Sequence, residues 1–408
     1  MNILYITPEL QHPSVRGPTR CYHFIRELSR RHCITLLSYT QGAIPDASLE
    51  EMRRYTEQIL LFRGDGAKAG PDVAWERIPL IGRPLKGILS RRKAMREMRR
   101  ALFELAPSAD VVLFHGKGVA SVLDGFGTAV PVVVDFCDAT SMRIASSMRY
   151  AGPVKRMRLV LSYVRVRLAE RKLIARGAPL AFVSARDREA IMGPNGRGEV
   201  VSIGVDHHFW TRRQPPGPSR TIVFVGVMDY GPNEDTALQL IDRVFPLVRE
   251  SVPDAELLIV GRGASQALIQ RAAERGRVTV TGFVEDVRPY LEKAALAAIP
   301  MRYGSGVQNK ALEAMAMQVP VVTTPLVASG LRAGGEADVP VYIANDESEF
   351  AERIVYLLGH REELESKGLE GRRFVEANYD WSRNAARLER MCLEAAVLDV
   401  RSSHAQAH

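Results

Sequence analysis

Residues 302–317 read RYGSGVQNKALEAMAM, and this stretch indicates the fold of the chain more strongly than any other. An apolar run ending at Pro300 precedes it, glycines stand at 304 and 306, and helical spacing begins near Gln308. A strand, a glycine-rich turn and a helix in that order let the backbone approach a ligand closely. The free N–H groups of the first helical turn then suit a phosphate. The stretch therefore predicts a phosphate-binding loop at the carboxyl end of a strand in an α/β domain.

Two charged residues follow the glycines on the expected helix. Lys310 lies within about the first turn, where a cation opposes the helix dipole unless an anion is bound there. Glu313 lies about one turn further on, where its carboxylate can accept hydrogen bonds from ribose hydroxyls. A solvated helix start with a local Lys310–Glu313 pair is the alternative explanation.

The same alternation of strand and helix extends outward over nearly the whole chain. Continuous apolar runs, unlike alternating ones, indicate strands buried on both faces of a parallel sheet. In the first half these runs are Asn2–Ile6, Cys33–Tyr39, Gln58–Phe62, Asp110–His115, Val132–Phe136 and Leu180–Val183. In the second half they are Thr221–Val225, Glu256–Val260, Val278–Thr281, Ala295–Pro300, Val319–Thr323 and Val339–Ile343. Helices are expected over Asn233–Glu250, Gln308–Met317 and Ala385–Leu398.

The segment Thr211–Arg220, TRRQPPGPSR, interrupts this periodicity with proline and glycine and predicts an interdomain linker. A chain of 408 residues also exceeds one ordinary core. We therefore expect an α/β fold with two Rossmann-like, doubly wound domains, residues 1–210 and 221–380. A ligand is expected in the cleft between the carboxyl ends of both sheets. A final helix over residues 381–398 and a disordered tail over 399–408 complete the expected organisation.

Composition argues against several classes of protein. With 46% hydrophobic and 25% charged residues, it is ordinary for a soluble globular protein. No apolar run approaches the roughly 20 residues that span a bilayer, and the start MNILYITPEL lacks the features of a signal peptide. The four cysteines show no metal or disulfide spacing, and His207 and His208 lack a carboxylate at ligand spacing. We therefore expect no metal site and a reducing, cytoplasmic environment.

The net charge of +8 arises mainly from two basic stretches, Arg83–Arg100 and Arg143–Arg176. In the second, KRMRLVLSYVRVRLAERKLIAR places Leu, Val and Tyr among Arg and Lys at helical spacing. Such a helix can lie on an anionic membrane surface. A helix with a solvated basic face, packed on its own sheet, explains the pattern equally well. Nucleic acid is not an expected partner, because no nucleic-acid-binding module is recognisable.

Eight further segments accompany the glycine-rich stretch in a defined order. They are NILYITPEL, GPTRCYHFIRELSRRH, VDFCDATS, IGVDHHFW, FVGVMDYGPNEDTALQL, LLIVGRG, TGFVEDVRPYL and YDWSRNAARL. Together with GSGVQNKALEAMAMQVPVVTT, this series resembles the GT-B glycosyltransferases of group 1 (family 4), and within them the sugar transferases of exopolysaccharide systems. The resemblance covers nearly the whole chain, and the ordered series is specific although each segment alone is weak.

The resemblance implies a GT-B enzyme that moves a sugar from a nucleotide-diphosphate sugar to a glycan or lipid-linked acceptor. It further implies metal-independent hexosyl transfer with retention, in surface or exopolysaccharide biosynthesis, with no cofactor besides the nucleotide-sugar substrate. The second domain is expected to hold the donor and the first domain the acceptor, with the last helix crossing back to the first domain. A lipid-linked acceptor implies a cytoplasmic protein that contacts the inner face of the cell membrane peripherally.

The resemblance also implies roles for individual residues. Glu313 matches the ribose-binding glutamate of the family's Glu-x7-Glu motif, and Phe283 and Val284 match the loop that holds the base. The remaining donor-site residues are expected to be Gly304, Ser305, Gly306, Val307, Gln308, Gly226 and Asn233. On the first domain, the residues expected to face the donor phosphates and the acceptor are Arg16, Gly17, Arg20 and His115.

The chain departs from the family at three positions. Ser305 stands eight residues before Glu313, where many relatives carry the first glutamate. No cation follows the strand Thr221–Val225, where relatives often have an Arg/Lys pair, so Lys310 and Arg302 are expected to stabilise the leaving group. Cys137 replaces a histidine that is common in relatives, so either the cysteine fills the site passively or Asp138 or Asp135 takes the polar role. The alternative for Asp138 is to cap the following helix.

Two other functions are alternatives to the transferase. A non-catalytic subunit that binds a nucleotide sugar or a partner enzyme needs neither the cations nor the histidine. A nucleotide-sugar 2-epimerase shares the architecture but needs an acid and a base converging on the sugar, so the missing first glutamate counts against it. The segment GRG at 261–263 lacks the remaining spacing of a dinucleotide fingerprint, which argues against NAD binding.

Overall fold

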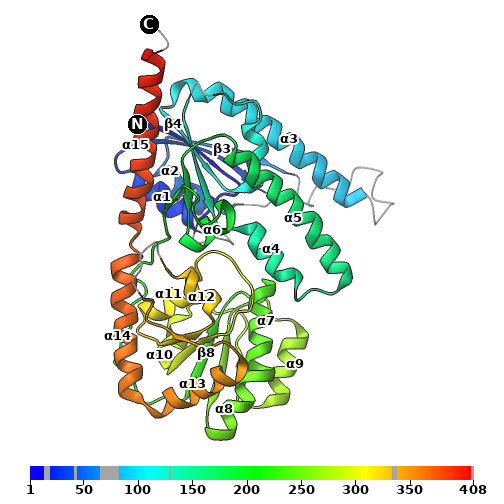
Figure 1. The fold of residues 1–408 in the computed structure, drawn as a ribbon, viewed down its shortest axis with the longest axis vertical. Helices are drawn as coiled ribbons and strands as arrows, with labels where there is room; N and C mark the ends of the chain where they lie inside the picture. The colour runs from blue at the N-terminus through cyan, green and yellow to red at the C-terminus, as the bar shows by residue number, and fades with distance from the viewer. Residues whose placement is uncertain (13–18, 41–43, 65–81, 128–129, 333–337, 406–408) are drawn as a thin grey trace.

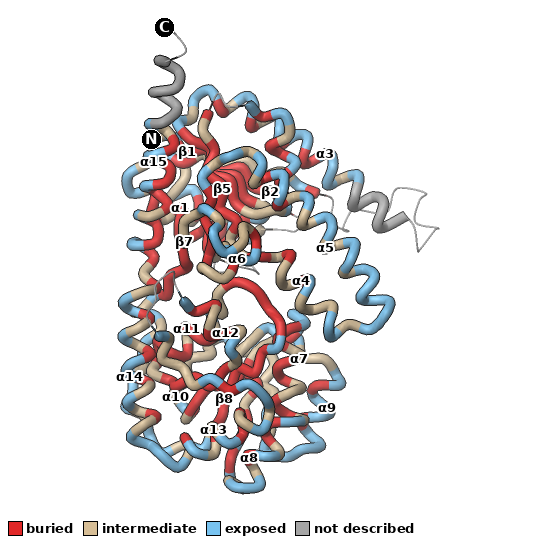
Figure 2. The backbone as a smooth tube through the Cα atoms, in the orientation of Figure 1, coloured by how far each residue is buried: buried red, intermediate tan, exposed pale blue. Residues whose placement is uncertain are grey.

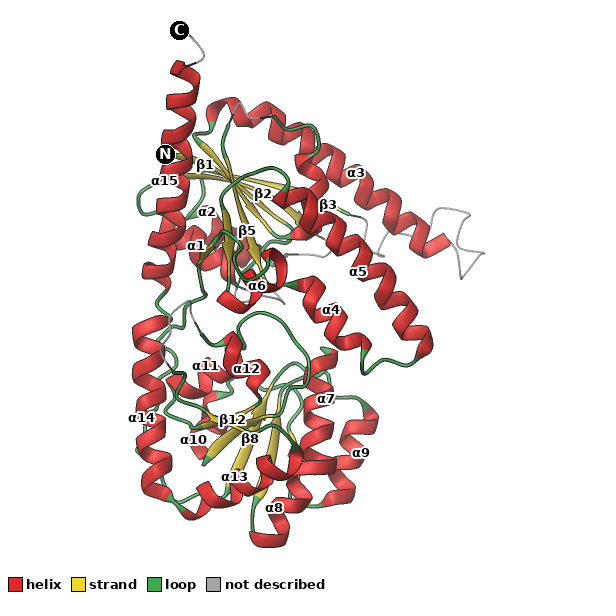
Figure 3. Ribbon diagram, viewed as in Figure 1, coloured by secondary structure: helices red, strands yellow, loops and turns green. Residues whose placement is uncertain are grey.

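The computed structural model describes residues 1–12, 19–40, 44–64, 82–127, 130–332 and 338–405. The chain forms two α/β domains that are stacked along the long axis of the molecule (Figure 1). Each domain is built on one parallel sheet with helices packed on both of its faces (Figure 3). The predicted pair of Rossmann-like domains is therefore confirmed.

The first sheet has seven parallel strands in the order β3-β2-β1-β4-β5-β6-β7. The strands are β1 (Asn2–Thr7), β2 (Cys33–Thr40), β3 (Gln58–Arg63), β4 (Val111–His115), β5 (Val132–Cys137), β6 (Leu180–Phe182) and β7 (Glu199–Val200). All six predicted strands are present. The prediction omits β7, because two residues are too few to produce a periodic signal.

The second sheet has six parallel strands in the order β10-β9-β8-β11-β12-β13. The strands are β8 (Thr221–Val225), β9 (Glu256–Val260), β10 (Val278–Val280), β11 (Leu296–Ile299), β12 (Val321–Thr323) and β13 (Tyr342–Ile343). Each coincides with a predicted run or with part of one. The predicted boundary between the two series at residues 211–220 lies between the last strand of one sheet and the first of the other.

Helices connect the strands and cover the faces of both sheets. In the first domain they are α1 (Arg20–Leu28), α2 (Asp46–Arg53), α3 (Gly82–Leu105), η2 (Ala106–Ser108), η3 (Lys117–Leu123), α4 (Thr140–Met148), α5 (Pro153–Ile174) and α6 (Ala185–Met192). In the second they are α7 (Gly231–Gln239), η4 (Leu240–Val244), α8 (Phe245–Ser251), α9 (Gln266–Arg275), α10 (Arg288–Lys293), α11 (Asn309–Ala316), α12 (Pro325–Gly330), α13 (Glu347–Gly359) and α14 (Arg361–Asn378). The single helix predicted over Asn233–Glu250 is thus α7 and α8 joined by the π-helical η4.

Burial on both faces explains why the strands read as continuous apolar runs. Ile3 and Tyr5 of β1 belong to one apolar cluster, whereas Leu4 and Ile6 belong to a second cluster. Successive side chains of a strand point to opposite faces, so the two clusters lie on the two sides of the first sheet. Figure 2 shows the buried strands at the centre of each domain. None of the helices in the described ranges combines the length and apolarity that crossing a bilayer requires.

The last helix, α15 (Trp381–Ala405), leaves the second domain and runs along the first, as predicted (Figure 1). The Trp381 ring stacks on His23 of α1 with a centroid distance of 4.1 Å, and the Asn384 side chain donates to the carbonyl of Ile203. The helix is longer than predicted: residues 399–405, expected as part of a disordered tail, continue it. Residues 406–408 lie outside the described part of the chain.

Candidate functional site

The two sheets place their topological switch points at the cleft between the domains. In the second sheet the strand order reverses at β8 and β11, which are adjacent in space but separated by β9 and β10 in sequence. The helical connections after these two strands leave on opposite faces, so their carboxyl ends diverge and form a crevice. The predicted glycine-rich loop, 302–308, follows β11 and therefore lies at this crevice.

Glycines also end the neighbouring strands and allow their backbones to approach one another. A Cβ atom on Gly261, after β9, would lie 1.9 Å from the carbonyl oxygen of Gly226, after β8. Gly261 has φ +134° and forms a β-bridge with Gly282, which precedes the predicted base-binding residues Phe283 and Val284. Phe283 is 70% exposed at this edge. This face of the cleft is therefore lined by backbone from the loops that follow adjacent strands, and such backbone can approach a ligand closely.

Lys310 joins the two helices that leave this crevice. Its Nζ donates to Oδ1 of Asn233 on α7 at 2.7 Å and to Oε1 of Gln308 at 3.2 Å. The Asn233 amide in turn donates to the carbonyl of Val227 in the loop after β8. Burial lowers the pKa of Lys310 to about 8, against the opposing attraction of Glu313. The structure thus brings Lys310, Asn233, Gln308 and the loop after Gly226 together, and their role as a donor site stays a prediction.

Glu313 lies on α11 beside this lysine, and its environment differs from that of a surface carboxyl. Burial raises the pKa of Glu313 to about 7, although Lys310 acts to lower it. No side chain in the described ranges makes a hydrogen bond or ion pair with its carboxylate. A carboxylate that accepts no hydrogen bond from the protein has both oxygens available for the hydroxyl groups of a ligand.

Arg302, the second predicted catalytic cation, is already engaged. Its Nε and Nη2 donate to the carboxylate of Asp235 at 3.1 and 2.5 Å, and its guanidinium lies 4.6 Å from the ring centroid of Tyr150. Tyr150 belongs to the first domain and also stacks on Tyr303, with a centroid distance of 5.2 Å. The structure therefore places Arg302 in a contact between the domains, where an acidic partner already neutralises its charge.

Two carboxylates of the first domain reach the glycine-rich loop. Ser305 Oγ donates to Asp138 Oδ2 at 2.6 Å, and the backbone N–H of Gly306 donates to Asp187 Oδ1 at 3.1 Å. Asp138 does not cap α4, whose N-cap residue is Ala139. It takes a polar role at the domain contact instead. Two hydrogen-bond donors of the loop predicted to hold a diphosphate are thus engaged by protein carboxylates.

Lys117 balances the charge of Asp138 and was not identified by sequence reasoning. Its Nζ lies 3.3 Å from Asp138 Oδ1 and donates to the carbonyl of Phe136 at 2.9 Å. Burial would raise the pKa of Asp138, but Lys117 and the Ser305 hydrogen bond outweigh it and hold the pKa at about 2. The sequence signal for Lys117 is its position two residues after the strand that ends at His115.

The first domain contains a buried network beneath this contact. His115 Nδ1 lies 2.9 Å from Asp135 Oδ2, and Arg20 donates to both carboxylate oxygens of Asp135 at 2.9 and 3.1 Å. Burial would raise the pKa of Asp135, but Arg20 and His115 hold it well below its usual range. Arg20 is 2% exposed and is therefore not placed to meet donor phosphates. The other predicted residues of that loop, Arg16 and Gly17, lie outside the described ranges.

Cys137 and Arg262 also stand at the carboxyl ends of strands, Cys137 at the end of β5 and Arg262 after β9. Burial raises the pKa of the Cys137 thiol to about 12, so this side chain is poorly suited to act as a nucleophile. Arg262 stands between Gly261 and Gly263, and its carbonyl accepts a hydrogen bond from the N–H of Met228 at 2.8 Å. Its guanidinium makes no ion pair with the side chains that the structure describes. Sequence reasoning rejected this segment as a dinucleotide fingerprint and overlooked it as a source of positive charge.

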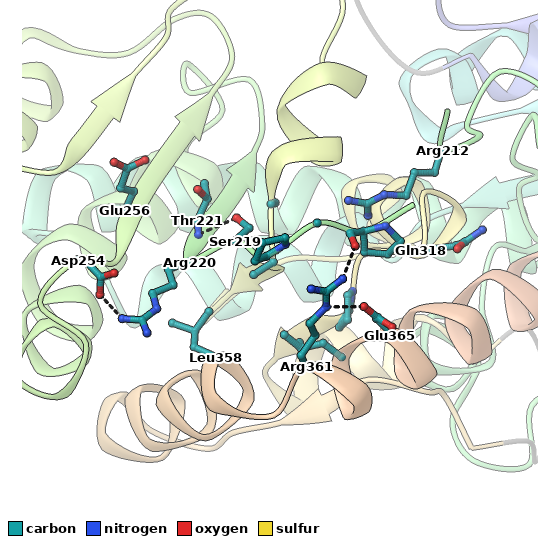
Figure 4. A pocket seen from close by; sticks show the side chains of 17 residues that line it. Arg212, Ser219, Arg220, Thr221, Asp254, Glu256, Gln318, Leu358, Arg361 and Glu365 are labelled. Carbon is teal, nitrogen blue, oxygen red and sulfur yellow. Dashed lines mark hydrogen bonds and ion pairs between the residues drawn. The ribbon is translucent and has the colours of Figure 1, made fainter. Parts of the chain in front are cut away.

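A cavity of about 590 Å³ lies at the amino ends of the strands of the second sheet, beside the linker. Its lining includes Thr221 at the start of β8 and Glu256 at the start of β9. Figure 4 shows two ion pairs among its charged side chains, Arg220 with Asp254 and Arg361 with Glu365. Ligands of open α/β sheets bind at the carboxyl ends of the strands, so we do not assign this cavity to the site.

The second domain also matches a known family. Residues 219–360 match the family model described as glycosyl transferases group 1, and this range contains β8–β13 and the glycine-rich loop. Over this range the chain resembles the group 1 glycosyltransferases. The resemblance seen in the sequence is therefore confirmed for the part of the chain that carries the candidate donor site.

One curated relative and many solved structures are similar to this chain. The relative is the GDP-mannose-dependent monoacylated alpha-(1-6)-phosphatidylinositol monomannoside mannosyltransferase of Corynebacterium glutamicum, 26% identical over 217 residues. The aligned part is 49% of this chain and 57% of that protein, so it spans just over half of the relative's length.

Solved structures match over the full two-domain fold. HepE from Anabaena, in complex with UDP and glucose, has a TM-score of 0.64 at 14% identity over 97% of this chain and 100% of that chain. TarM, from S. aureus, has a TM-score of 0.68 at 11% identity over 96% of this chain and 99% of that chain. At these identities the matches establish the fold, GT-B, and not the substrate.

Proposed function

We propose that this protein transfers a hexose from a nucleotide-diphosphate sugar to a lipid-linked or glycan acceptor, with retention, in surface polysaccharide biosynthesis. The observation that carries the proposal is the Lys310–Glu313 pair at a glycine-rich loop on the switch point of a group 1 glycosyltransferase domain. Glu313 lacks a polar partner among the described side chains, and the ribose of a nucleotide supplies hydroxyls for it.

The residues of the cleft suit transfer by positioning and charge stabilisation. Lys310 stays largely protonated at pH 7 because its pKa is about 8, and it would stabilise the departing diphosphate. Arg262 is a second candidate cation, since its guanidinium has no acidic partner among the described residues. Such a reaction requires no protein nucleophile or metal in our proposal, which accords with the raised pKa of Cys137.

The proposed acceptor class rests on the curated relative and on the first domain. The relative's name describes a mannosyltransferase that acts on a phosphatidylinositol monomannoside, which is a lipid-linked sugar. The first domain of the present chain is strongly basic in α3 and α5, as expected for a protein that works at an anionic membrane surface. We therefore propose a lipid-linked acceptor met at the cytoplasmic face of the membrane.

A specific observation also favours a second candidate, a non-catalytic nucleotide-sugar-binding subunit. Asp138 and Asp187 occupy hydrogen-bond donors of the glycine-rich loop, and Cys137 stands where relatives carry histidine. A subunit that only binds the nucleotide sugar needs neither the histidine nor a cation after β8. Turnover distinguishes this candidate from the enzyme.

The first experiment is a thermal-shift screen of UDP-, GDP-, ADP- and dTDP-sugars on the wild type and on Glu313→Ala. Ligand at about 100 times its Kd should add roughly 2.7 kcal/mol of stability to the wild type. We expect one nucleotide to raise the melting temperature of the wild type and not that of Glu313→Ala. Glu365→Ala, which removes a carboxylate at the remote cavity, is the matched control and should respond like the wild type.

Turnover is then measured with the nucleotide sugar found, as release of nucleoside diphosphate in the presence of lipid-linked sugars. Lys310→Ala should lower kcat by about 10²–10³-fold if Lys310 stabilises the leaving group. Full turnover in Lys310→Ala would contradict that role. Donor binding without any turnover would favour the non-catalytic subunit, and no shift with any nucleotide would overturn the donor site itself.

A further inference from the structure

Helix α5 carries an apolar stripe that no part of the described chain covers. The helix has 22 residues, and its N-terminal part projects with α4 beyond the body of the first domain (Figures 1 and 2). The exposed apolar side chains are Val154 (65%), Met157 (65%), Val160 (45%), Leu161 (57%), Val164 (48%) and Leu168 (60%). All of them except Val160 recur at alternating spacings of three and four residues, so these five side chains form one continuous face of the helix.

The opposite face of α5 attaches the helix to its domain. Leu173 and Glu170 are buried, and the Glu170 carboxylate accepts from the backbone N–H of Ser141 on α4 at 3.3 Å. Arg167 pairs with the same carboxylate at 3.2 Å. Because this inner face already packs on the domain, the outward apolar stripe does not contribute to its core.

Cations border the stripe on both sides. At 100° per residue, Arg158, Arg165 and Lys172 follow one edge, and Arg156, Arg167 and Arg171 follow the other. Glu170 is the single acidic residue of α5, and it is buried. Arg156, Arg158 and Arg165 make no ion pair with the described residues. An apolar face between two rows of long basic side chains can insert into lipid while the cations reach the headgroups.

We propose that the apolar stripe of α5 and its flanking arginines form a docking surface for an anionic lipid membrane. A second copy of the chain is the competing occupant, because the spacing of the stripe is also that of a coiled-coil seam. Pairing two such stripes would bring the basic edges of both helices against each other, with no exposed acidic residue on α5 to offset them. Charge complementarity therefore selects the anionic lipid surface.

The surface leads to the mouth of the cleft. Gly152 precedes α5, and Tyr150, two residues earlier, stacks on Tyr303 of the second domain. Tyr303 is adjacent to Gly304 of the glycine-rich loop. A membrane bound along α5 would therefore lie beside the cleft that is proposed to receive a lipid-linked acceptor. The docking surface rests on the proposed function only for the nature of that acceptor.

The test is co-sedimentation with vesicles of phosphatidylcholine alone and of phosphatidylcholine with about one-third phosphatidylglycerol. Met157→Glu combined with Leu161→Glu tests the stripe, and Arg156→Gln, Arg158→Gln and Arg165→Gln combined test the cations. The matched control is Leu369→Glu combined with Leu393→Glu, which places the same charges at apolar side chains that are 46% and 42% exposed on α14 and α15.

We expect the wild type and the control to bind the anionic vesicles and to bind them less tightly as salt rises. The stripe variant should lose binding at least tenfold, and each neutralised arginine should weaken it about fivefold. Binding that is equal for neutral and anionic vesicles, or that is unchanged in either α5 variant, would overturn the proposal. So would a wild-type dimer in analytical ultracentrifugation that Met157→Glu/Leu161→Glu converts to monomer.

The nucleotide thermal shift, measured on the same variants, separates this proposal from the proposed function. A retained shift in the α5 variants shows that they are folded and that lost vesicle binding is specific to the surface. Vesicle binding by a wild type that responds to no nucleotide would support the surface and overturn the donor site. A nucleotide shift without vesicle binding would do the reverse.

Discussion

Lys310 and Glu313 lie about one turn apart on α11, and burial moves their pKa values toward each other, to about 8 and about 7. Desolvation opposes each charge separately, while their mutual attraction opposes both shifts. Their protonation states therefore change close to physiological pH. Sequence reasoning placed these two residues correctly on the helix after the glycines, because both are local to that motif.

At this scale we predict a bell-shaped dependence of nucleotide-sugar affinity on pH. Hydrogen bonds from ribose favour the ionised form of Glu313, so affinity should rise with pH as this group loses its proton near pH 7. It should fall again above about pH 8, as Lys310 becomes neutral. Calorimetric titration between pH 5.5 and 9.5, as a range of about four units, measures both limbs.

Glu313→Gln separates the two limbs of that profile. The variant has no carboxyl to titrate, so its weaker affinity should be level below about pH 7 and still decrease above about pH 8. The charge of a diphosphate diester does not change over this range, so the diphosphate does not add a limb of its own. An affinity that stays constant across the range in the wild type would contradict the proposed roles of both groups.

At the scale of elements, the carboxyl ends of β8 and β9 approach too closely for any side chain. Gly261 combines φ +134° with a backbone contact to Gly226, and Gly226 itself lies against Asn233, the partner of Lys310. The close packing of these two loops therefore supports the cation at the donor site. Sequence reasoning identified the strands but not this contact, because loop-to-loop distances depend on how the strands pair.

We predict that Gly261→Ala lowers the stability of the second domain by about 2–4 kcal/mol, since the new Cβ forces both a strained φ and a displaced backbone. Differential scanning calorimetry should show this as a fall of several degrees in the transition of that domain. Gly276→Ala is the control: Gly276 also has positive φ, +64°, but a Cβ there meets no atom within 4 Å. Equal losses in the two variants would show that the close approach does not matter.

At the scale of the whole molecule, the domains meet through the glycine-rich loop itself. Asp138 and Asp187 of the first domain accept hydrogen bonds from Ser305 and Gly306, and Arg186 Nη2 donates to the carbonyl of Gly306 at 3.1 Å. With a pKa of about 2, Asp138 is ionised at physiological pH. A bound diphosphate at this loop would meet a like charge and would compete for the same donors.

We therefore predict that Asp138→Asn tightens the binding of the free nucleoside diphosphate by several-fold, measured by calorimetric titration. If Asp138 also contacts the donor sugar, the complete nucleotide sugar should gain less than the nucleoside diphosphate does. Asp242→Asn makes the same change in net charge at a residue paired with Arg271, and its affinity should match the wild type. Weaker binding of the diphosphate in Asp138→Asn would refute this competition.

The sequence by itself determined the two α/β domains, eleven strands within a residue or two, and the loop at 302–308 with Lys310 and Glu313. These features follow from local periodicity and from motifs within one strand–turn–helix unit. Their agreement is expected, because strands buried on both faces must be apolar throughout and a phosphate loop must be rich in glycine.

Only the tertiary structure decided which charged and polar side chains meet, both within each domain and between the domains. Arg302 pairs with Asp235, 67 positions earlier, and Arg20 is buried against Asp135, 115 positions later, so neither has the free charge that its place in the sequence indicated. The contact of Asp138 with Ser305 joins residues 167 positions apart on different domains. Side-chain pairing over such distances depends on the order of strands in each sheet and on how the two domains close, and neither is encoded in local periodicity.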